Sequence, residues 1–179
     1  MKIYTRRGDD GTTGLLYGGR VRKDSPAIEA NGAVDEAQAA IGLARAEADP
    51  GGELDVLLVR VQRELYVLMA EVATAVANRA KLTPGVSLVT PEMVDVLEGD
   101  IDRISEKFDM PTEFVIPGGG RIPACLDLAR TVVRRAERLA LAVDLPGSSV
   151  GAYLNRLSDL LWAVARWQEG TSLRARTGR

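Results

Sequence analysis

Five stretches of the chain repeat apolar residues at the three- and four-residue spacing of an α-helix, and segments rich in proline and glycine separate them. The most regular stretch runs from Leu54 to Val76. The others begin near Ser25-Pro26, Thr90-Pro91, Pro123 and Ser148-Ser149. Hydroxyl caps and first-turn prolines are typical of helix starts. The pattern predicts an all-α protein, a five-helix bundle in a ferritin-like up-and-down arrangement.

Helix breakers set the expected boundaries. The first helix ends at Pro50-Gly51-Gly52, and a loop is expected over residues 78–89. Residues 109–123 hold several prolines and three successive glycines, so this segment is predicted to be non-helical. The fourth helix is expected from about Pro123 to Asp144. Alanines on the first and fourth helices allow either close helix packing or a subunit interface.

The 179 residues, 46% of them hydrophobic, suit a single domain with a full core. We expect an N-terminal arm over residues 1–24, the bundle over 25–170 and a flexible polar tail over 171–179. A net charge of -2 and 4% aromatic residues disfavour nucleic acid as a partner. We predict no signal peptide and no membrane span.

Cysteine and histidine usage excludes several chemistries. Cys125 is the only cysteine, so no intrachain disulfide is possible and a cytoplasmic location is expected. The absence of histidine excludes His-ligated zinc, Ser-His-Asp hydrolysis and an imidazole base. No metal site built from protein side chains is predicted.

The first 24 residues lack a helical period and contain glycines at positions 8, 11, 14, 18 and 19. We predict an ordered glycine-rich loop arm with short extended pieces. Its backbone N–H groups can approach phosphate oxygens, and Lys23, just before the first helix, can reach the same anion. The spacing fits neither a Walker loop nor a dinucleotide fingerprint. A flexible terminal loop explains the pattern equally well.

Arginines recur every fourth residue on the fourth helix, at Arg130, Arg134 and Arg138. A solvated face with local ion pairs explains such a stripe, and so does a clamp for phosphate oxygens. Asp35 or Glu36 of the first helix can pair with an arginine of this helix.

The last helix places polar Asn155 and Arg156 among leucines, which requires partners for them. A polar seam that fixes helix register is the alternative to a site there.

Five segments, in this order and spacing, resemble the PduO-type ATP:cob(I)alamin adenosyltransferases over nearly the whole chain. They are TRRGDDGTTGLLYGGRVRKD, EANGAVDEAQAAIGLARAE, FVIPGG, ARTVVRRAER and YLNRLSDLLWAVAR. The resemblance implies a homotrimer of five-helix bundles with active sites between subunits. It also implies transfer of the 5′-deoxyadenosyl group of ATP to cob(I)alamin or cob(I)yrinic acid a,c-diamide, giving adenosylcobalamin and triphosphate.

The resemblance also assigns residues. The ATP side would comprise Thr5, Arg6, Arg7, Gly8, Thr13, Gly14 and Lys23 from the arm, with Arg134, Arg135, Ala136, Glu137, Arg138 and Asn155 from the neighbouring subunit. Asp9 and Gly11 would keep the arm's shape. The cobalamin side would comprise Asp35 and Arg130, an ion pair between subunits, and Phe114, which packs under the corrin ring. Arg134, Arg138, Asp35, Arg130 and Phe114 are the residues expected to act in catalysis.

Mg²⁺ would accompany ATP, cobalamin would be a substrate, and an electron donor would reduce the cobalt. An adenosylcobalamin-dependent enzyme is a further possible partner. Arg7 stands where the family commonly has a small hydroxyl residue, which alters the expected phosphate contacts. A bundle that binds ATP and corrinoid as a carrier or sensor, without catalysis, is the alternative function.

Overall fold

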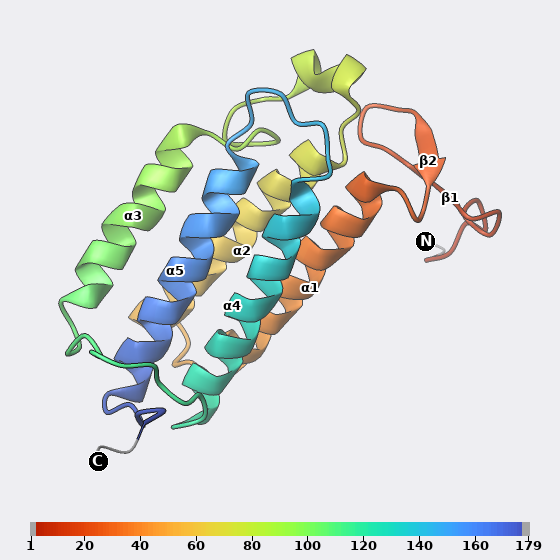
Figure 1. Cartoon of the computed structure of the whole chain (residues 1–179). Helices are drawn as coiled ribbons and strands as arrows, with labels where there is room; N and C mark the ends of the chain where they lie inside the picture. Colours follow the sequence, from red (N-terminus) through yellow and green to blue (C-terminus); the bar gives the residue numbers. More distant parts are fainter. Residues whose placement is uncertain (1–2, 177–179) are drawn as a thin grey trace.

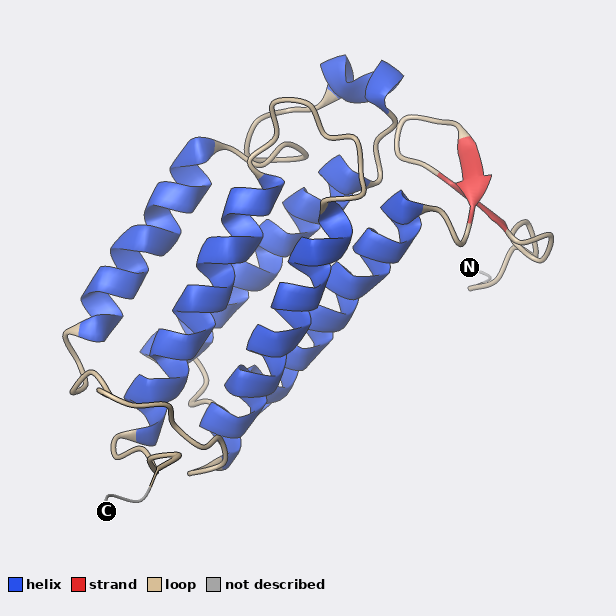
Figure 2. Cartoon of the chain, in the orientation of Figure 1, coloured by secondary structure: helices blue, strands red, loops and turns tan. Residues whose placement is uncertain are grey.

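The computed structural model describes residues 3–176 and is built almost entirely of helices that run side by side (Figures 1 and 2). The long helices are α1 (Pro26–Ala46), α2 (Glu53–Val72), α3 (Pro91–Ser105), α4 (Arg121–Ala140) and α5 (Val150–Glu169). The short elements are β1 (Thr12–Gly14), β2 (Arg20–Arg22) and the 3-10 helix η1 (Val76–Lys81). The predicted all-α, five-helix bundle is confirmed. Among the described residues, no helix is long and apolar enough to cross a bilayer.

The core lies where α4 packs between α1 and α5, with α2 against α1 and α3 against α5. The apolar stripe of α2 is buried in it, with Leu58, Leu65 and Leu68 almost fully covered. Each such side chain contributes about 1.5–3 kcal/mol on burial. Alanines at the α1–α4 contact, including Ala37 and Ala136, are also fully buried. These alanines therefore serve close packing inside the chain.

Several helix ends differ from the predicted positions. The second helix ends at Val72 and not at Val76, and just beyond its end the Thr74 hydroxyl donates to the Ala70 carbonyl at 2.7 Å. Part of the predicted 78–89 loop belongs to η1. The fourth helix starts at Arg121, before the expected proline, because the first turn does not use the N–H that proline lacks. It ends at Ala140, four residues earlier than expected.

The predicted capping residues stand at the starts of the helices, but not all of them make the expected side-chain hydrogen bond. Ser25 and Thr90 occupy the N-cap positions of α1 and α3, yet neither makes a side-chain cap hydrogen bond. A proline follows each and starts the helix with its fixed φ. At α5, Ser148 Oγ accepts a hydrogen bond from the Val150 N–H at 3.1 Å.

The segment after α2 is held by a buried carboxylate. Glu71 is fully buried and accepts hydrogen bonds from Arg79 Nη2 at 2.8 Å and from the Val89 N–H at 2.7 Å. A single side chain therefore pins both η1 and the strand-like stretch that leads into α3.

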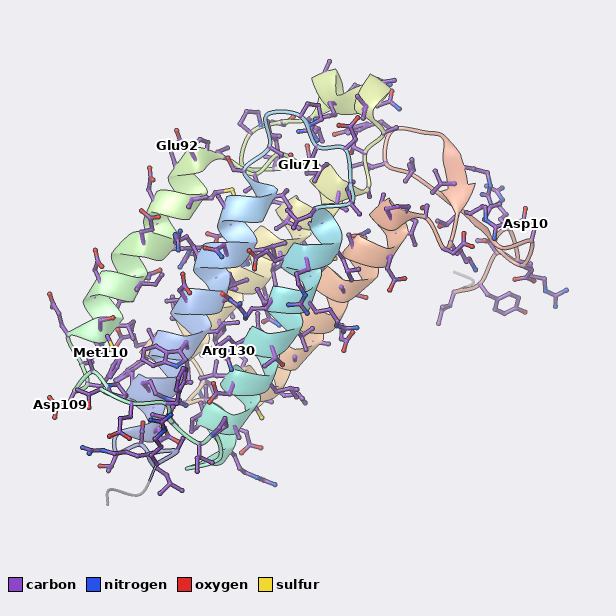
Figure 3. All side chains as sticks on the ribbon, viewed as in Figure 1. Asp10, Glu71, Glu92, Asp109, Met110 and Arg130 are labelled. Atoms are coloured by element: carbon purple, nitrogen blue, oxygen red, sulfur yellow. The ribbon has the colours of Figure 1, made fainter. Side chains whose placement is uncertain are left out.

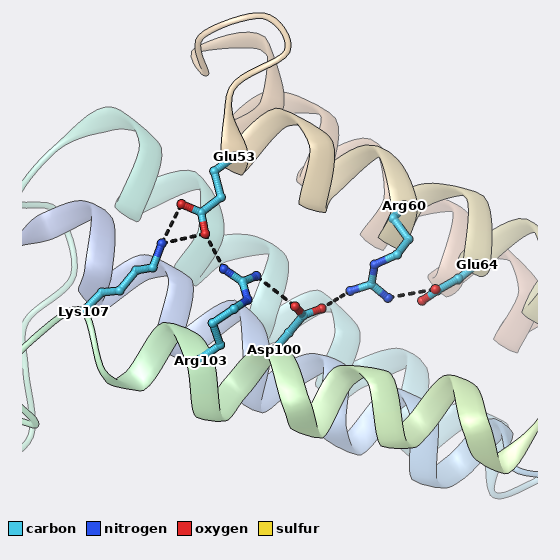
Figure 4. A network of polar contacts seen from close by, with 6 residues as sticks. All are labelled: Glu53, Arg60, Glu64, Asp100, Arg103 and Lys107. Atoms are coloured by element: carbon cyan, nitrogen blue, oxygen red, sulfur yellow. Dashed lines mark hydrogen bonds and ion pairs between the residues drawn. The ribbon is translucent and has the colours of Figure 1, made fainter.

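A chain of ion pairs links α2 to α3 (Figure 4). Its members, in order, are Glu64, Arg60, Asp100, Arg103, Glu53 and Lys107. Tyr153 of α5 joins the chain by donating its hydroxyl to Glu64 Oε2 at 2.6 Å. Burial, and then the charge of Glu64, raises the pKa of Tyr153 well above its usual value. Polar side chains thus hold α3 and α5 to α2.

The N-terminal arm is ordered and carries short extended pieces, as predicted. β1 and β2 form an antiparallel pair, with Thr13 opposite Val21. The arm attaches to the bundle through the Leu16 N–H, which donates to the Ala73 carbonyl at 2.9 Å. Residues 1 and 2 of the predicted arm lie outside the described residues. In Figure 1 the arm projects beyond α1, away from α5.

The tail differs from the expected flexible segment. The Ile116 N–H donates to the Leu173 carbonyl at 2.8 Å, and the Ala175 N–H donates to the Phe114 carbonyl at 2.7 Å. Residues 173–175 therefore pair with the loop that follows α3. The last three residues, 177–179, lie outside the described residues.

Candidate functional site

The arm is shaped by an Asp10 turn. Asp10 Oδ1 accepts hydrogen bonds from the Thr12 N–H at 2.9 Å and from its hydroxyl at 2.8 Å, which lowers the pKa of Asp10. Arg20 donates to Thr12 Oγ1 at 3.0 Å and to the Arg7 carbonyl at 2.6 Å. The sequence predicted a shape role for Asp9. The hydrogen bonds with Thr12 are made by its neighbour Asp10, which was not predicted. Gly11 supports the predicted shape role, since its φ of 81° favours glycine.

Gly8 and Lys23, both predicted ATP-side residues, lie against each other. A Cβ at Gly8 would fall 3.2 Å from Lys23 Nζ and 3.1 Å from the Thr12 carbonyl. The lysine backbone is fixed as well, since its N–H donates to the Gly11 carbonyl at 2.9 Å. A cation therefore lies directly over a glycine turn, which is the arrangement that favours an anion.

The remaining predicted arm residues are exposed or half-buried. Thr5, Arg6 and Arg7 are exposed, and Thr5 Oγ1 lies 3.5 Å from the Arg7 N–H. Arg6 adopts a φ of 60°, which is uncommon outside glycine. Thr13 and Gly14 belong to β1. The arm thus presents two arginines to solvent beside the Gly8 turn.

The middle of α4 carries an exposed arginine face made of Arg134, Arg135 and Arg138. Arg135 forms an ion pair with Glu36 of α1, which confirms that one of the two α1 acids pairs with the fourth helix. Among residues 3–176, neither Arg134 nor Arg138 pairs with a carboxylate. The alternative of local ion pairs therefore holds for Arg130 of the predicted stripe, which pairs with Asp127, and for Arg135 beside it.

Asn155 and Glu137 face each other between α5 and α4. Asn155 Nδ2 donates to Glu137 Oε1 at 3.1 Å, next to the buried Ala136. Arg156 lies on another side of α5 and pairs with Glu98 at 3.0 Å. The two polar residues therefore separate: Asn155 lies beside the arginine face, and Arg156 belongs to a register-fixing contact with α3.

A cavity of about 1360 Å³ opens at the end of the bundle where α4 begins and α5 ends. It is lined by residues 111–115, Pro117, Asp127, Arg130, Trp162, Arg166, Ala175 and Arg176. Arg130 is labelled in Figure 3 on the same side of the bundle as Asp109 and Met110, where the loop after α3 starts. The side chain of Phe114 is 90% exposed at this α4–α5 cavity. Two of the predicted cobalamin-side residues, Phe114 and Arg130, thus share one cavity.

Two buried charges in this cavity were not predicted. Asp127 Oδ2 accepts a hydrogen bond from Arg166 Nη2 at 2.6 Å, and Asp127 Oδ1 lies 3.3 Å from Arg130 Nε. Arg166 lies near the Trp162 ring, 5.8 Å from its centroid. The signal in the sequence was a charged residue inside the apolar run LLWAVARW, since a buried charge requires a partner.

The structure does not bring all predicted residues together within one chain. Arg130 contacts Asp127, and Asp35 is exposed on α1 with no ion pair among the described residues. Within residues 3–176 no hydrogen bond or ion pair joins the arm to the arginine face, and Figure 3 places Asp10 of the arm far from Arg130. The predicted ATP-side residues are therefore divided between two surfaces.

The chain is similar to known proteins over most of its length. A family model described as cobalamin adenosyltransferase matches residues 3–168. The corrinoid adenosyltransferase of Mycobacterium tuberculosis (strain CDC 1551 / Oshkosh) is 41% identical over 170 residues, covering 92% of this chain and 87% of the relative. That of Bacillus subtilis (strain 168) is 39% identical over 172 residues, covering 93% and 86%.

A solved structure has the same fold. A phenylalanine-to-alanine variant of the PduO-type ATP:corrinoid adenosyltransferase from Lactobacillus reuteri, complexed with cobalamin and ATP, superposes with a TM-score of 0.87. It is 26% identical and covers 98% of this chain and 100% of the other. The shared fold and the relatives thus show a helical-bundle transferase. The chain belongs to the cobalamin adenosyltransferase family, so the predicted resemblance is confirmed.

Proposed function

We propose that this chain transfers the 5′-deoxyadenosyl group of ATP to a reduced corrinoid, giving the adenosylcorrinoid and triphosphate. The observation that carries the proposal is the arrangement along α4. Arg134, which has no carboxylate partner in the part of the chain that the structure describes, follows the cavity residue Arg130 by one turn, about 6 Å along the helix axis. One helix thus presents a cationic face that can bind phosphate beside a large cavity. This arrangement suits transfer of a group between two bound ligands.

On the ATP side, the arm of one subunit would meet the arginine face of a neighbour in a homotrimer. The arm supplies Thr5, Arg6, Arg7, Gly8, Thr13, Gly14 and Lys23. The neighbouring α4 and α5 supply Arg134, Arg135, Ala136, Glu137, Arg138 and Asn155. The arm projects away from its own α4, and this supports the arrangement. In that position the arm can cover the arginine face of another subunit.

Mg²⁺ would accompany the triphosphate. Within residues 3–176, no group of three or more acidic or cysteine side chains is placed to hold a metal ion. The phosphate oxygens would therefore coordinate the ion, and Lys23 with the arginines would offset the remaining charge. Phosphate oxygens are ordinary Mg²⁺ ligands in nucleotide enzymes.

The chemistry needs no protein nucleophile or base. The electron pair of cobalt(I) forms a bond to C5′ of ATP, the C5′–O bond breaks, and the triphosphate leaves with that bond's electrons. The chain contributes alignment of the two reactants and positive charge at the leaving group. Arg134 and Arg138 are the candidates for that charge, because no carboxylate of the described chain neutralises them.

The α4–α5 cavity would hold the corrinoid. The exposed Phe114 ring can pack under the corrin ring and exclude the lower cobalt ligand, which makes reduction to cobalt(I) easier. Arg130 would pair with Asp35 of a neighbouring subunit. An electron donor must supply the cobalt(I) state, an adenosylcobalamin-dependent enzyme can receive the product, and a cytoplasmic location remains our prediction.

A spectroscopic assay tests the proposal. Purified protein, Mg²⁺-ATP and chemically reduced cobalamin should give the visible spectrum of adenosylcobalamin and one triphosphate per product. ATP binding without formation of the cobalt–carbon bond would favour the carrier or sensor alternative. Omission of ATP is the control for spontaneous cobalt oxidation.

A further inference from the structure

We propose that Arg166 is a positioning residue that fixes both Arg130 and the loop bearing Phe114 at the α4–α5 cavity. The inference rests on the proposed function, and it adds a residue that neither touches ATP nor belongs to the predicted site. Arg166 is an unusual core residue, because its side chain is 1% exposed in an otherwise apolar stretch of α5.

The first link runs to Arg130. Arg166 Nη2 donates to Asp127 Oδ2 at 2.6 Å, and the other oxygen of that carboxylate contacts Arg130 Nε at 3.3 Å. The Asp127 side chain is only 5% exposed, so the protein must supply most of the partners of its carboxylate. A carboxylate that is held on one oxygen by a buried guanidinium presents its second oxygen in a fixed direction. Arg166 therefore sets where Arg130 enters the cavity.

The second link runs to the loop. Arg166 Nε lies 3.2 Å from Glu169 Oε2, an ion-pair contact that lacks the geometry of a hydrogen bond, and Glu169 Oε1 accepts a hydrogen bond from the Gly119 N–H at 3.2 Å. A Cβ at Gly119 would fall 2.5 Å from Glu169 Oε1, so the carboxylate seats directly against the loop backbone. Ser172 also donates its hydroxyl to Glu169 Oε2 at 2.7 Å, which ties in the segment that pairs with the Phe114 backbone.

One guanidinium thus connects two parts of the cavity that are far apart in sequence. Replacing a buried ion pair by apolar residues is often neutral or favourable for stability, so a purely structural role does not require these charges. A role in geometry does require them, because the guanidinium holds Asp127 by a hydrogen bond and Glu169 by an ion-pair contact at the same time. The expected consequence is selective: loss of Arg166 disturbs corrinoid binding and leaves the ATP surface intact.

The test measures cob(II)alamin binding in the presence of ATP, together with ATP binding and Tm. We expect Arg166→Met to weaken cob(II)alamin binding at least tenfold while ATP affinity changes less than twofold. Arg166→Lys should restore much of the Tm but not corrinoid affinity, because one ammonium cannot hold both carboxylates in the same geometry. The matched control is Arg156→Met, an arginine on the same helix that pairs outside the cavity.

If Arg166→Met fails to fold, Gly119→Ala provides the test instead. This change leaves every charge in place and displaces only the Glu169 contact, so it should weaken cob(II)alamin binding with a small change in Tm. Unchanged corrinoid affinity in the folded variants, or equal losses of corrinoid and ATP affinity, would overturn the inference. Because binding is measured without turnover, failure of the wild-type protein to form adenosylcobalamin would count against the proposed function alone.

Discussion

Arg138 donates a hydrogen bond from Nη1 to the main-chain carbonyl of Arg134 at 2.9 Å, so the two residues are coupled across one turn of α4. Both side chains are exposed, and neither has a carboxylate partner within residues 3–176. Like charges one turn apart repel each other, and a polyanion relieves that repulsion. The face is therefore suited to triphosphate.

Removal of either arginine should weaken ATP binding and turnover. Arg134→Ala or Arg138→Ala should each cost roughly 1.5–3 kcal/mol, which is about a 10- to 150-fold loss. Because both side chains are exposed, Tm should change little. Calorimetric titration with Mg²⁺-ATP is the measurement, and Arg63→Ala on the exposed side of α2 is the control. Wild-type ATP affinity in both variants would rule out the assignment of this face to phosphate.

Phe114 should matter for cobalt reduction more than for adenosyl transfer. Phe114→Ala removes a ring that is 90% exposed, so the fold should be unaffected. We expect a large loss of activity when the assay starts from cobalt(II) and a small loss when it starts from pre-reduced cob(I)alamin. Phe114→Leu, which keeps an apolar side chain, should retain part of the first activity. Equal losses in the two assays would contradict a role in excluding the lower ligand.

The arm and the arginine face should act across subunits. Lys23→Ala and Arg134→Ala homo-oligomers should each be weakly active, whereas co-expressed mixtures should regain activity. In a random trimer mixture about three quarters of trimers contain both variants and each has one intact site in three, so about a quarter of wild-type activity should return. Light scattering checks the trimer mass. The control is the homo-oligomer of the double variant Lys23→Ala/Arg134→Ala. No recovery in mixed trimers would place both residues in the same subunit's site.

Tyr153 should make stability depend on alkaline pH. Its pKa is raised in the folded chain, so its contribution is fully present below the unfolded value of about 10 and is lost as pH rises through the folded pKa. Tyr153→Phe removes a hydrogen bond to Glu64, which costs roughly 1.5–3 kcal/mol near neutral pH.

Denaturant unfolding from pH 7 to 11 measures this difference. The gap between wild type and Tyr153→Phe should be constant up to about pH 9 and shrink above pH 10. Tyr66→Phe, at an exposed tyrosine of α2, should show no such change. The opposite result, a difference in unfolding free energy that widens as pH rises, would mean that folding favours the ionised phenol.

Periodicity predicted the bundle well because each long helix buries one stripe of small or aliphatic side chains, as Leu65 and Ala37 do. It predicted helix ends less well. Just beyond the end of α2 Thr74 bonds back to Ala70, and the Ser25 hydroxyl makes no cap although it occupies the cap position. Such choices are decided by local hydrogen-bond competition, which residue spacing does not report.

The proximity of Lys23 to the glycine arm was predictable from its position just before the first helix, whereas its role in phosphate binding stays a prediction. Helix positions also predicted that Asp35 or Glu36 could pair with an arginine of the fourth helix, but not that the pair would be Glu36 with Arg135. The Asp127–Arg166 contact was not predicted, because it joins α4 to α5 at the level of a cavity that only the packed bundle creates. The tail was expected to be flexible because TSLRAR is polar, yet its pairing with the loop uses main-chain groups and is independent of side-chain polarity.

The main-chain pairing of residues 173–175 with the loop after α3 limits where a tag or label can be attached to the protein. Ala175 and Arg176 line the α4–α5 cavity, so an affinity tag or a surface tether attached at residue 176 would stand in the path of a large ligand. A tag on the arm would meet the same difficulty at Lys23. The exposed turn at Val86, which belongs neither to the cavity lining nor to the arm, is the better position for a label or an immobilisation site.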